Sequence, residues 1–164
     1  MIYWITSDTH FGHDKMRESL YRSNYFEDKI MKRHSSLVKS NDVLIHLGDF
    51  CFGKNEHWHR EFMMGIKGVK WLLRGNHDKK SISWYLDHGW DFVGDSMTIK
   101  MYGKIILFSH RPMADTGFDL NIHGHLHNGD HRMEEFSEIL TQKHKLVKME
   151  HDYKPVSLKS LSGQ

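Results

Sequence analysis

Carboxylate, amide and imidazole side chains occur in short clusters that are far apart in the sequence. The clusters are Asp8-Thr9-His10, Gly48-Asp49, Gly75-Asn76-His77-Asp78, His110 and Gly124-His125-Leu126-His127. Histidine is frequent, with 15 residues against one cysteine. Oxygen and imidazole ligands without thiolates suit first-row transition metals and disfavour a structural zinc site. The residue types therefore indicate chemistry assisted by a metal ion.

Two of the clusters offer a pair of donor side chains each. Asp8 and His10 are separated by one residue. His125 and His127 have the same spacing. Alternate residues of an extended chain point the same way, so one segment can offer two donor side chains together. An Asp-x-His pair alone is a weak signal, whereas two imidazoles spaced in this way after a glycine are hard to explain by packing.

The remaining clusters combine donor groups with turn-forming residues. Gly75 permits an unusual backbone angle. Asn76 can offer a neutral oxygen to a metal, and His77 can donate a proton. Each cluster alone also has a structural interpretation: Gly48-Asp49 as a turn, and the segment that begins at Gly75 as a β-turn with an N-cap for the next helix. A single histidine such as His110 is more often structural.

Short apolar runs precede all the clusters and predict the strands that position them. We expect buried strands at Ile2–Ser7, Val43–Leu47, Val69–Leu73, Lys104–Ser109 and Leu120–His123. Ligands of open α/β sheets bind beyond the carboxyl ends of the strands. The clusters are therefore expected to meet at one site.

Other patterns complete the predicted α/β architecture. A strand at Ser96–Met101 forms a hairpin with the run that ends at Ser109, and Leu146–Glu150 is a further candidate strand. Helices are expected from about residue 14 to 39 in two pieces, over Asn55–Gly65, and over Ser81–His88.

Composition indicates a folded protein of one domain that spans residues 1–164. Hydrophobic residues make up 38% and charged residues 27%, and the net charge of +2 is too small to diagnose a nucleic-acid binder. The single Cys51 excludes an internal disulfide, which favours a reducing compartment. No apolar run approaches the roughly 18–20 residues that a membrane span needs. We therefore expect a cytoplasmic protein that does not bind membranes.

In their order along the chain, the clusters resemble the motifs of the calcineurin-like metallophosphoesterase superfamily. The motifs are D-T-H at 8–10, G-D at 48–49, G-N-H-D at 75–78, His110, and G-H-L-H at 124–127. The ending Tyr153-Lys154-Pro155-Val156-Ser157-Leu158 also resembles that of the superfamily's small bacterial and viral members without a cap. The resemblance implies two packed mixed β-sheets flanked by helices, as a four-layer α/β/β/α sandwich. Periodicity alone gives only an α/β fold.

The resemblance also implies a pair of divalent metal ions bridged by Asp49. The expected ligands are Asp8, His10 and His127 for one ion, and Asn76, His110 and His125 for the other. A bridging carboxylate can hold two cations about 3.5–4 Å apart, with a hydroxide between them. The mixed nitrogen and oxygen donors suit manganese first, with iron, zinc, cobalt or nickel as alternatives.

The implied reaction is hydrolysis of a phosphoester by that hydroxide, which attacks phosphorus opposite the leaving group. His77 is expected to protonate the departing oxygen. Arg74 and Arg111 are candidates to bind the phosphate, and His13 is a candidate substrate contact. Many family members continue the Gly-Asp motif with an acidic residue and an arginine. Here Asp49 is followed by Phe50-Cys51-Phe52-Gly53-Lys54, without the acidic residue or the arginine. The usual carboxylate or imidazole partner of His77 is therefore missing, unless Asp78 or a residue of another loop takes its place.

Several functions share this ligand set. A phosphodiesterase or phosphatase acting on a small or nucleotide-like substrate is the leading hypothesis, and diesters suit a small site without a cap. A nuclease for single-stranded nucleic acid is the alternative, for which the basic region from Lys143 to Lys159 is suggestive. A non-catalytic binding module would not need every ligand. An oxygen-activating iron site would leave Asn76 unused.

Overall fold

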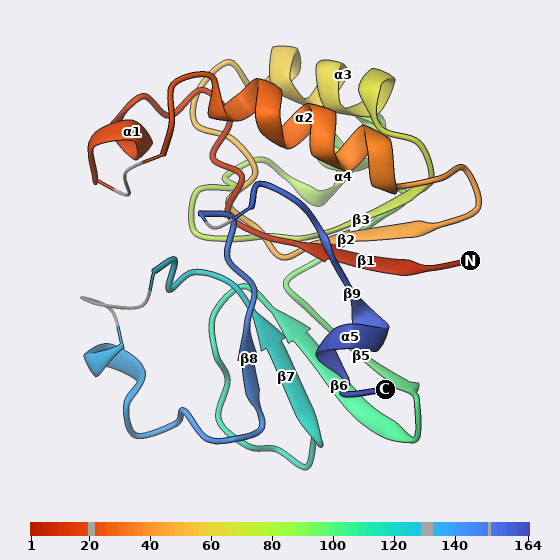
Figure 1. Cartoon of the computed structure of the whole chain (residues 1–164), viewed down its shortest axis with the longest axis vertical. Coiled ribbons are helices and arrows are strands. Elements are labelled where there is room, and N and C mark those ends of the chain that lie inside the picture. Colours follow the sequence, from red (N-terminus) through yellow and green to blue (C-terminus); the bar gives the residue numbers. More distant parts are fainter. Residues whose placement is uncertain (20–21, 129–132, 151) are drawn as a thin grey trace.

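Two β-sheets packed face to face hold the loops that carry the clusters (Figure 1). The computed structural model describes residues 1–19, 22–128, 133–150 and 152–164. The strands are β1 (Tyr3–Thr6), β2 (Val43–His46), β3 (Val69–Leu73), β4 (Phe92–Gly94), β5 (Ser96–Met101), β6 (Lys104–Ser109), β7 (Leu120–His123), β8 (His144–Leu146) and β9 (Val156–Ser157). The first sheet has the order β4-β3-β2-β1-β9 and the second the order β5-β6-β7-β8.

Both sheets are mixed. Strands β1 to β4 are parallel, and β9 joins β1 in the antiparallel direction. In the second sheet β5 and β6 form the expected antiparallel hairpin, whereas β6, β7 and β8 are parallel. The predicted fold class, two mixed sheets flanked by helices, is confirmed.

Helices cover the outer face of the first sheet. The helices are α1 (Lys15–Ser19), α2 (Phe26–Leu37), α3 (Asn55–Gly65), α4 (Ile82–Asp87) and α5 (Leu158–Leu161), with a 3-10 turn at Glu134–Phe136. In Figure 1, α2, α3 and α4 lie on one side of the first sheet and the second sheet lies on the other. The helix α5 contacts β1 and β9. On the outer face of the second sheet, buried Asn121 is covered by a loop, where its Oδ1 accepts the backbone N–H of Met113 at 2.9 Å.

The side chains of alternate residues in the central strands pack into two separate hydrophobic cores. Leu44 of β2 packs into the core beneath the helices, whereas its neighbours Val43 and Ile45 pack into the core between the sheets. Ile106 and Phe108 of β6 enter this second core from the other sheet. A strand buried on both faces needs apolar residues at consecutive positions, which explains the continuous apolar runs of the sequence.

The buried His34 links α2 to β1. Its Nδ1–H donates to the carbonyl oxygen of Ile30 at 2.8 Å, and its Nε2 accepts the hydroxyl of Thr6 at 2.9 Å. Both ring nitrogens are used by the neutral imidazole, and burial lowers the pKa of His34 to about 4. A proton on His34 would break the hydrogen bond from Thr6 and place a charge in the core.

Acid should therefore destabilise the protein through His34. Because its pKa falls from 6.5 in the unfolded chain to about 4 in the folded one, the unfolded chain binds more protons between these values. The stabilising contribution is complete above pH 6.5 and is lost as the pH falls to 4, by up to about 3 kcal/mol. We expect His34→Gln to flatten the pH dependence of the free energy of unfolding, measured by denaturant titration. The exposed-site control His57→Gln should keep the wild-type slope, and parallel curves for wild type and His34→Gln would contradict the assignment.

Most predicted elements lie where the sequence patterns place them. The range predicted for α3 is identical to the observed one, and α1 and α2 form two pieces within residues 14 to 39, with residues 20–21 outside the described part. The strand predicted at Leu146–Glu150 is wrong, because β8 ends at Leu146. Val147 donates its backbone N–H to the carbonyl of His123 at 2.7 Å, but it lies beyond the end of β8. Val147 and Met149 are buried in a loop, so their apolar side chains indicate burial and not a strand.

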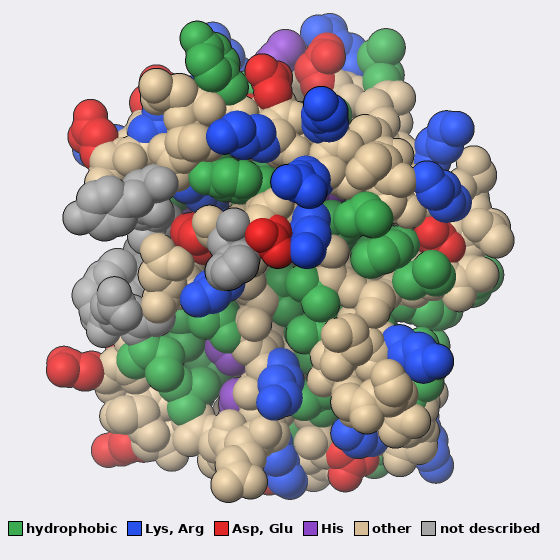
Figure 2. All heavy atoms as spheres, viewed as in Figure 1, with side chains coloured by type: hydrophobic (Ala, Val, Ile, Leu, Met, Phe, Trp, Pro, Cys, Tyr) green, Lys and Arg blue, Asp and Glu red, His purple; other side chains and the backbone are tan. Residues whose placement is uncertain are grey.

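Lysine and arginine side chains are spread over the surface, with a group over α2 in the upper part of Figure 2. In the described part of the chain, we find no helix whose length and apolar character would let it cross a membrane.

Candidate functional site

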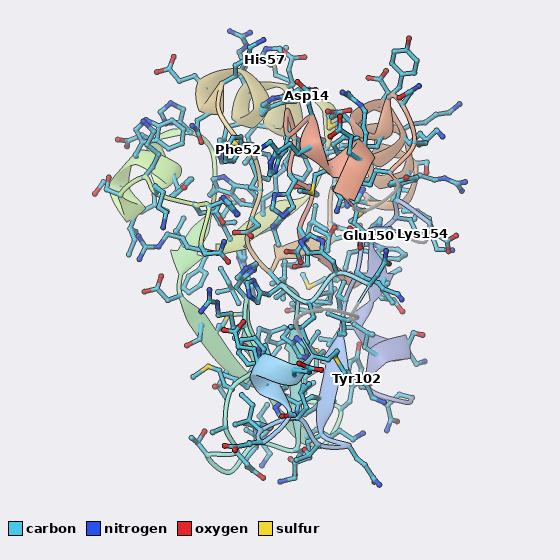
Figure 3. The ribbon with its side chains drawn as sticks, turned by 90° about the vertical axis from the view of Figure 1, so that its left-hand side faces the viewer. Asp14, Phe52, His57, Tyr102, Glu150 and Lys154 are labelled. Carbon is cyan, nitrogen blue, oxygen red and sulfur yellow. The ribbon has the colours of Figure 1, made fainter. Side chains whose placement is uncertain are left out.

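The clusters meet at one edge of the paired sheets, on the side of the molecule that Figure 3 shows. Because β1, β2 and β3 are parallel, the loops that follow them lie side by side. The backbone N–H of Asp8 donates to the carbonyl of Gly48 at 2.9 Å, and that of His10 donates to Asp49 at 3.0 Å. The second sheet joins them where Nδ1–H of His110 donates to the carbonyl of Leu47 at 2.8 Å. Loops from both sheets therefore share one site.

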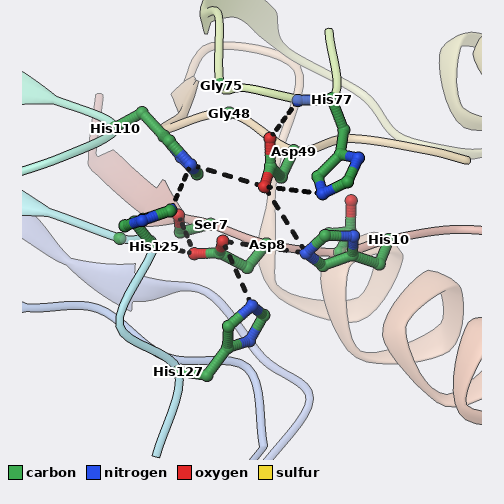
Figure 4. A network of polar contacts seen from close by, with 12 residues as sticks. Ser7, Asp8, His10, Gly48, Asp49, Gly75, His77, His110, His125 and His127 are labelled. Atoms are coloured by element: carbon green, nitrogen blue, oxygen red, sulfur yellow. Dashed lines mark hydrogen bonds and ion pairs between the residues drawn. The ribbon is translucent and has the colours of Figure 1, made fainter. Parts of the chain in front are cut away.

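The candidate ligands form groups that can each hold a metal ion (Figure 4). The groups are Asp8, His10 and His127; His10, Asp49 and His77; and Asp49, His110 and His125. Within each group the donor atoms lie within 4.8 Å of one another. Asn76 adjoins the third group, with its Oδ1 3.0 Å from Nε2 of His110. The structure thus brings together all the residues predicted as ligands, and it places His77 beside them.

Several donor atoms in this site are buried without a hydrogen-bond partner among the described residues. They include Asp8 Oδ1, Asp49 Oδ2 and His10 Nε2. His10 Nε2 lies 3.7 Å from Asp49 Oδ2 and 3.9 Å from Asp8 Oδ1. Two ligand atoms that bind the same cation, each at a distance of about 2.1 Å, lie roughly 3–3.5 Å from one another. Unpaired buried polar atoms are costly, so their position and chemistry fit cations between them.

The backbone of the site is strained at most of the candidate ligands. The φ angles are 51° at Asp8, 48° at His10, 54° at Asp49, 67° at His125 and 48° at His127. Left-handed backbone costs a residue with a side chain about 1–2 kcal/mol, and such residues cluster at functional sites. The expectation that Asp8 and His10, or His125 and His127, alternate along extended backbone is therefore wrong. Tight left-handed turns aim these side chains at the site instead.

Two glycines permit the close approach of neighbouring loops. A Cβ atom at Gly75 would collide with the Asp49 side chain, and one at Gly124 would collide with Ser7 Oγ. Gly75 itself does not have a positive φ; the left-handed glycine of this region is Gly48, with φ of 91°. Gly75 is therefore required for space and not for the unusual backbone angle that its sequence suggests.

Buried negative charge dominates the electrostatics of the site. Burial raises the pKa of Asp8, and burial lowers the pKa of His10 well below 6.5. Burial alone would also lower the pKa of His110, but Asp49 and Asp8 raise it to about 9. His110 and His10 in turn lower the pKa of Asp49 against the effect of burial. Asp8 and Asp49 thus favour the protonated, positively charged form of the buried His110 imidazole. The same carboxylates will also attract metal cations.

A buried ion pair that the sequence analysis missed supports the ligand loop. Glu150 Oε1 accepts Nδ1–H of His127 at 3.0 Å and the Nη2–H of Arg22 at 2.5 Å. Arg22 also donates to the carbonyl of Asp8 at 2.6 Å and to that of Thr9 at 2.8 Å. A carboxylate on Nδ1 leaves Nε2 of His127 facing Asp8 Oδ1, 3.7 Å away, as in carboxylate–histidine–metal arrangements. No local signal marks residues 128 positions apart as partners.

The Asp78 side chain links two of the ligand loops through hydrogen bonds to their backbones. Its Oδ2 accepts the backbone N–H groups of Asp49 at 2.7 Å and Gly75 at 2.8 Å, and its Oδ1 accepts that of Phe50 at 3.1 Å. Both oxygens are thus engaged by backbone groups. Asp78 organises the site and is not positioned as a partner of the His77 ring.

His77 lies at the open side of the ligand cluster. Its backbone N–H donates to Asp49 Oδ1 at 2.8 Å, and its Nε2 lies 3.9 Å from Asp49 Oδ2. Its side chain is 32% exposed, against 1% for that of Asp49. The ring of His13 lies 6.1 Å from that of His77 and stacks on Phe52 at 4.2 Å. His77 is therefore the member of the cluster that a substrate can reach most easily.

Both candidate phosphate-binding arginines line a cavity of about 300 Å³ beside the cluster. Asn76 and His110 contribute to the same cavity. Arg74 is held by Asp95, whose Oδ1 accepts its Nη2–H at 2.7 Å, whereas Arg111 is exposed. Arg111 is thus the freer of the two arginines to move toward a bound anion.

The chain belongs to the calcineurin-like phosphoesterase family, which matches it over residues 1–156. Membership implies metal-dependent hydrolysis of phosphoesters. A similar solved structure is the protein of unknown function AQ665 from Aquifex aeolicus, with a TM-score of 0.80 and 28% identity over 99% of this chain and 98% of that one. A novel archaeal phosphodiesterase has a TM-score of 0.45 and 20% identity over 76% and 73% of the two chains. No curated protein sequence matches significantly.

Proposed function

We propose that this protein is a dinuclear metal-dependent phosphodiesterase for small or nucleotide-like substrates. The observation that carries the proposal is the convergence of buried, unpaired oxygen and nitrogen atoms of Asp8, His10 and Asp49. In this proposal the ligands are Asp8, His10 and His127 for one ion, and Asn76, His110 and His125 for the other, with Asp49 shared between them. The donor set suits manganese, iron, zinc, cobalt or nickel, and we expect manganese. Bound cations would polarise the phosphoryl oxygens and make a bound water more acidic.

The protein's own side chains would bind the substrate and move a proton. Arg111, with Arg74 beside it, supplies positive charge for the phosphate oxygens from the wall of the adjoining cavity. His77 Nε2 would donate a proton to the departing ester oxygen, because its side chain is 32% exposed and lies beside Asp49. The left-handed loops around Asp8 and Asp49 fix these groups before substrate arrives.

Two cavities flank the ligand cluster and favour a diester over a monoester. The cavity of about 300 Å³ adjoins Asn76 and His110. A second cavity, of about 290 Å³, is lined by His77 and by none of the residues that line the first. A phosphodiester has an organic group on each side of phosphorus, so it can place one in each cavity.

The activity is tested with bis(p-nitrophenyl) phosphate and p-nitrophenyl phosphate, each with and without added Mn²⁺. We expect faster hydrolysis of the diester, loss of turnover with a chelator, and recovery when Mn²⁺ is returned. Absence of turnover by the folded protein with every one of Mn²⁺, Fe²⁺, Zn²⁺, Co²⁺ and Ni²⁺ would contradict the proposal.

A nuclease is the second candidate, and a basic cavity on α2 favours it. This cavity of about 570 Å³ is lined by Lys29, Lys32 and Arg33 together with Tyr153. It coincides with the group of blue side chains over α2 in Figure 2. None of the residues proposed as metal ligands lines it, so a polymer would have to extend from the site to reach it. Binding of single-stranded DNA that weakens steeply with salt, and cleavage of that DNA, would distinguish a nuclease.

Glu150→Gln should weaken metal binding without unfolding the protein. The variant removes the carboxylate that orients His127 and accepts from Arg22. Loss of such a partner typically lowers metal affinity about 10- to 100-fold. Titration calorimetry with Mn²⁺ measures the change, and Glu138→Gln, at an exposed site, is the matched control. Equal affinities of wild type and Glu150→Gln would show that Glu150 does not act through His127.

A further inference from the structure

An exposed aromatic ring stands at the mouth of the proposed active site. Phe52 is 50% exposed, whereas Phe50 and Cys51 before it are 0% and 2% exposed. The ring of Phe52 stacks on His13 at an interplanar angle of 14° and meets the ring of His77 edge-on at 5.6 Å. Figure 3 shows Phe52 close to Asp14, with Glu150 lower in the same view.

The loop around Phe52 is built to present this ring. Gly53 has a φ of 67°, and no atom lies within 4 Å of the position that a Cβ would take there. Lys54 follows with a φ of 46°. Glycine takes this conformation without a steric penalty, whereas Lys54 takes it at a cost in backbone strain. Burial of Phe52 would favour folding, so its exposure at this place suggests contact with a ligand.

The cavity beside His77 has the chemistry of a nucleotide site. Phe52 and His77 line it together with Asn55, Lys79 and Lys80. The Nζ of Lys80 lies 5.4 Å from the ring of Trp84, whereas Lys79 is exposed and has no ion pair with any residue that the structure describes. A flat aromatic surface next to ammonium groups suits an aromatic base that carries phosphate.

We infer that this cavity holds the leaving group of the substrate and that the leaving group is a nucleoside or nucleotide whose base stacks on Phe52. The inference rests on the proposed function, because His77 can protonate only the ester oxygen on its own side of phosphorus. Phe52 then determines specificity and does not take part in bond cleavage. Lys79 and Lys80 add positive charge beside the departing group.

The alternative is that Phe52 only supports the ring of His13. The two interpretations differ in what they predict for ligands that share a phosphoryl group but differ in the base. Stacking of one base is worth about 5- to 100-fold in affinity. A purely structural Phe52 would affect ligands with and without a base alike.

The test uses the metal-loaded protein and two hydrolysis-resistant probes. The probes are the methylene phosphonate analogues of AMP and of ribose 5-phosphate, and titration calorimetry measures their affinities. We expect wild type to bind the AMP analogue about 5- to 100-fold more tightly than the other probe. Phe52→Leu should bring this ratio close to one by weakening the AMP analogue alone, and Phe52→Trp should preserve it. Tyr102→Asn, at an exposed aromatic residue in the turn between β5 and β6, should leave both affinities unchanged.

The outcomes separate this inference from the proposed function. Equal affinities of wild type for the two probes would overturn the base-binding cavity and leave the phosphate site intact. An equal loss for both probes in Phe52→Leu would also overturn it, because Phe52 would then act through His13 or His77. Failure of both probes to bind would overturn the phosphate site and the proposed function together.

Discussion

Asp49→Asn is expected to lower turnover by at least about 10³-fold, or about 4 kcal/mol of transition-state stabilisation. Asp49 lies in two of the candidate metal groups, with His10 and His77 on one side and with His110 and His125 on the other. An amide retains the shape and the Oδ1 that accepts the backbone N–H of His77, but it lacks the charge that two cations would share. Metal content, measured by inductively coupled plasma mass spectrometry, should fall below two ions per chain.

The fold should survive this substitution. His110 and His10 stabilise the Asp49 carboxylate, so Asp49→Asn should lower the stability of the metal-free protein, while Asp8 remains as a charged partner of His110 and the chain stays folded. Thermal unfolding with a chelator checks this point. Asp87→Asn, on the exposed end of α4, is the matched control for both measurements. Wild-type metal content in Asp49→Asn would contradict the bridging assignment.

His77→Ala is expected to lower kcat by about 10²- to 10⁴-fold while leaving metal content unchanged. His77 would act on the departing oxygen, so its loss should matter more for a basic leaving group than for a stable phenolate. A diester that releases an alcohol should therefore lose more activity than one that releases p-nitrophenolate. Measurement of kcat for both substrates in both proteins tests this dependence.

The matched control is His57→Ala, because His57 is exposed at the start of α3. It should leave both rates unchanged. The position of His77 within 4.8 Å of donor atoms of His10 and Asp49 would also permit metal coordination. Loss of metal in His77→Ala would therefore assign it as a ligand, and an equal loss of rate for both substrates would exclude its role as an acid.

Local sequence patterns were sufficient for most of the helices and strands, whereas the two packed sheets were expected from the family resemblance. Strands buried on both faces require consecutive apolar residues, so β1, β2 and β3 are visible as runs of such residues. Because β1, β2 and β3 are parallel, the residues that follow them had to meet at one edge. Short elements such as β4 and β9 were missed, because two or three residues carry too little pattern.

Features that depend on distant contacts could not be predicted. The pairing of Arg22 with Glu150 joins residues 128 positions apart, and neither lies in a recognisable motif. The left-handed backbone at Asp8 and His127 is imposed by the loops around them, whereas the spacing alone suggested extended chain. Phe52 gave no chemical signal in the sequence, because its significance comes from exposure beside His77.

Anomalous diffraction from crystals grown with Mn²⁺ tests the central claim most directly. We expect two peaks about 3.5–4 Å apart, on either side of the Asp49 carboxylate. One should lie among Asp8, His10 and His127, and the other beside His110 and His125. A crystal that contains manganese but shows no peak at Asp49, or a single peak bound elsewhere, would contradict the account.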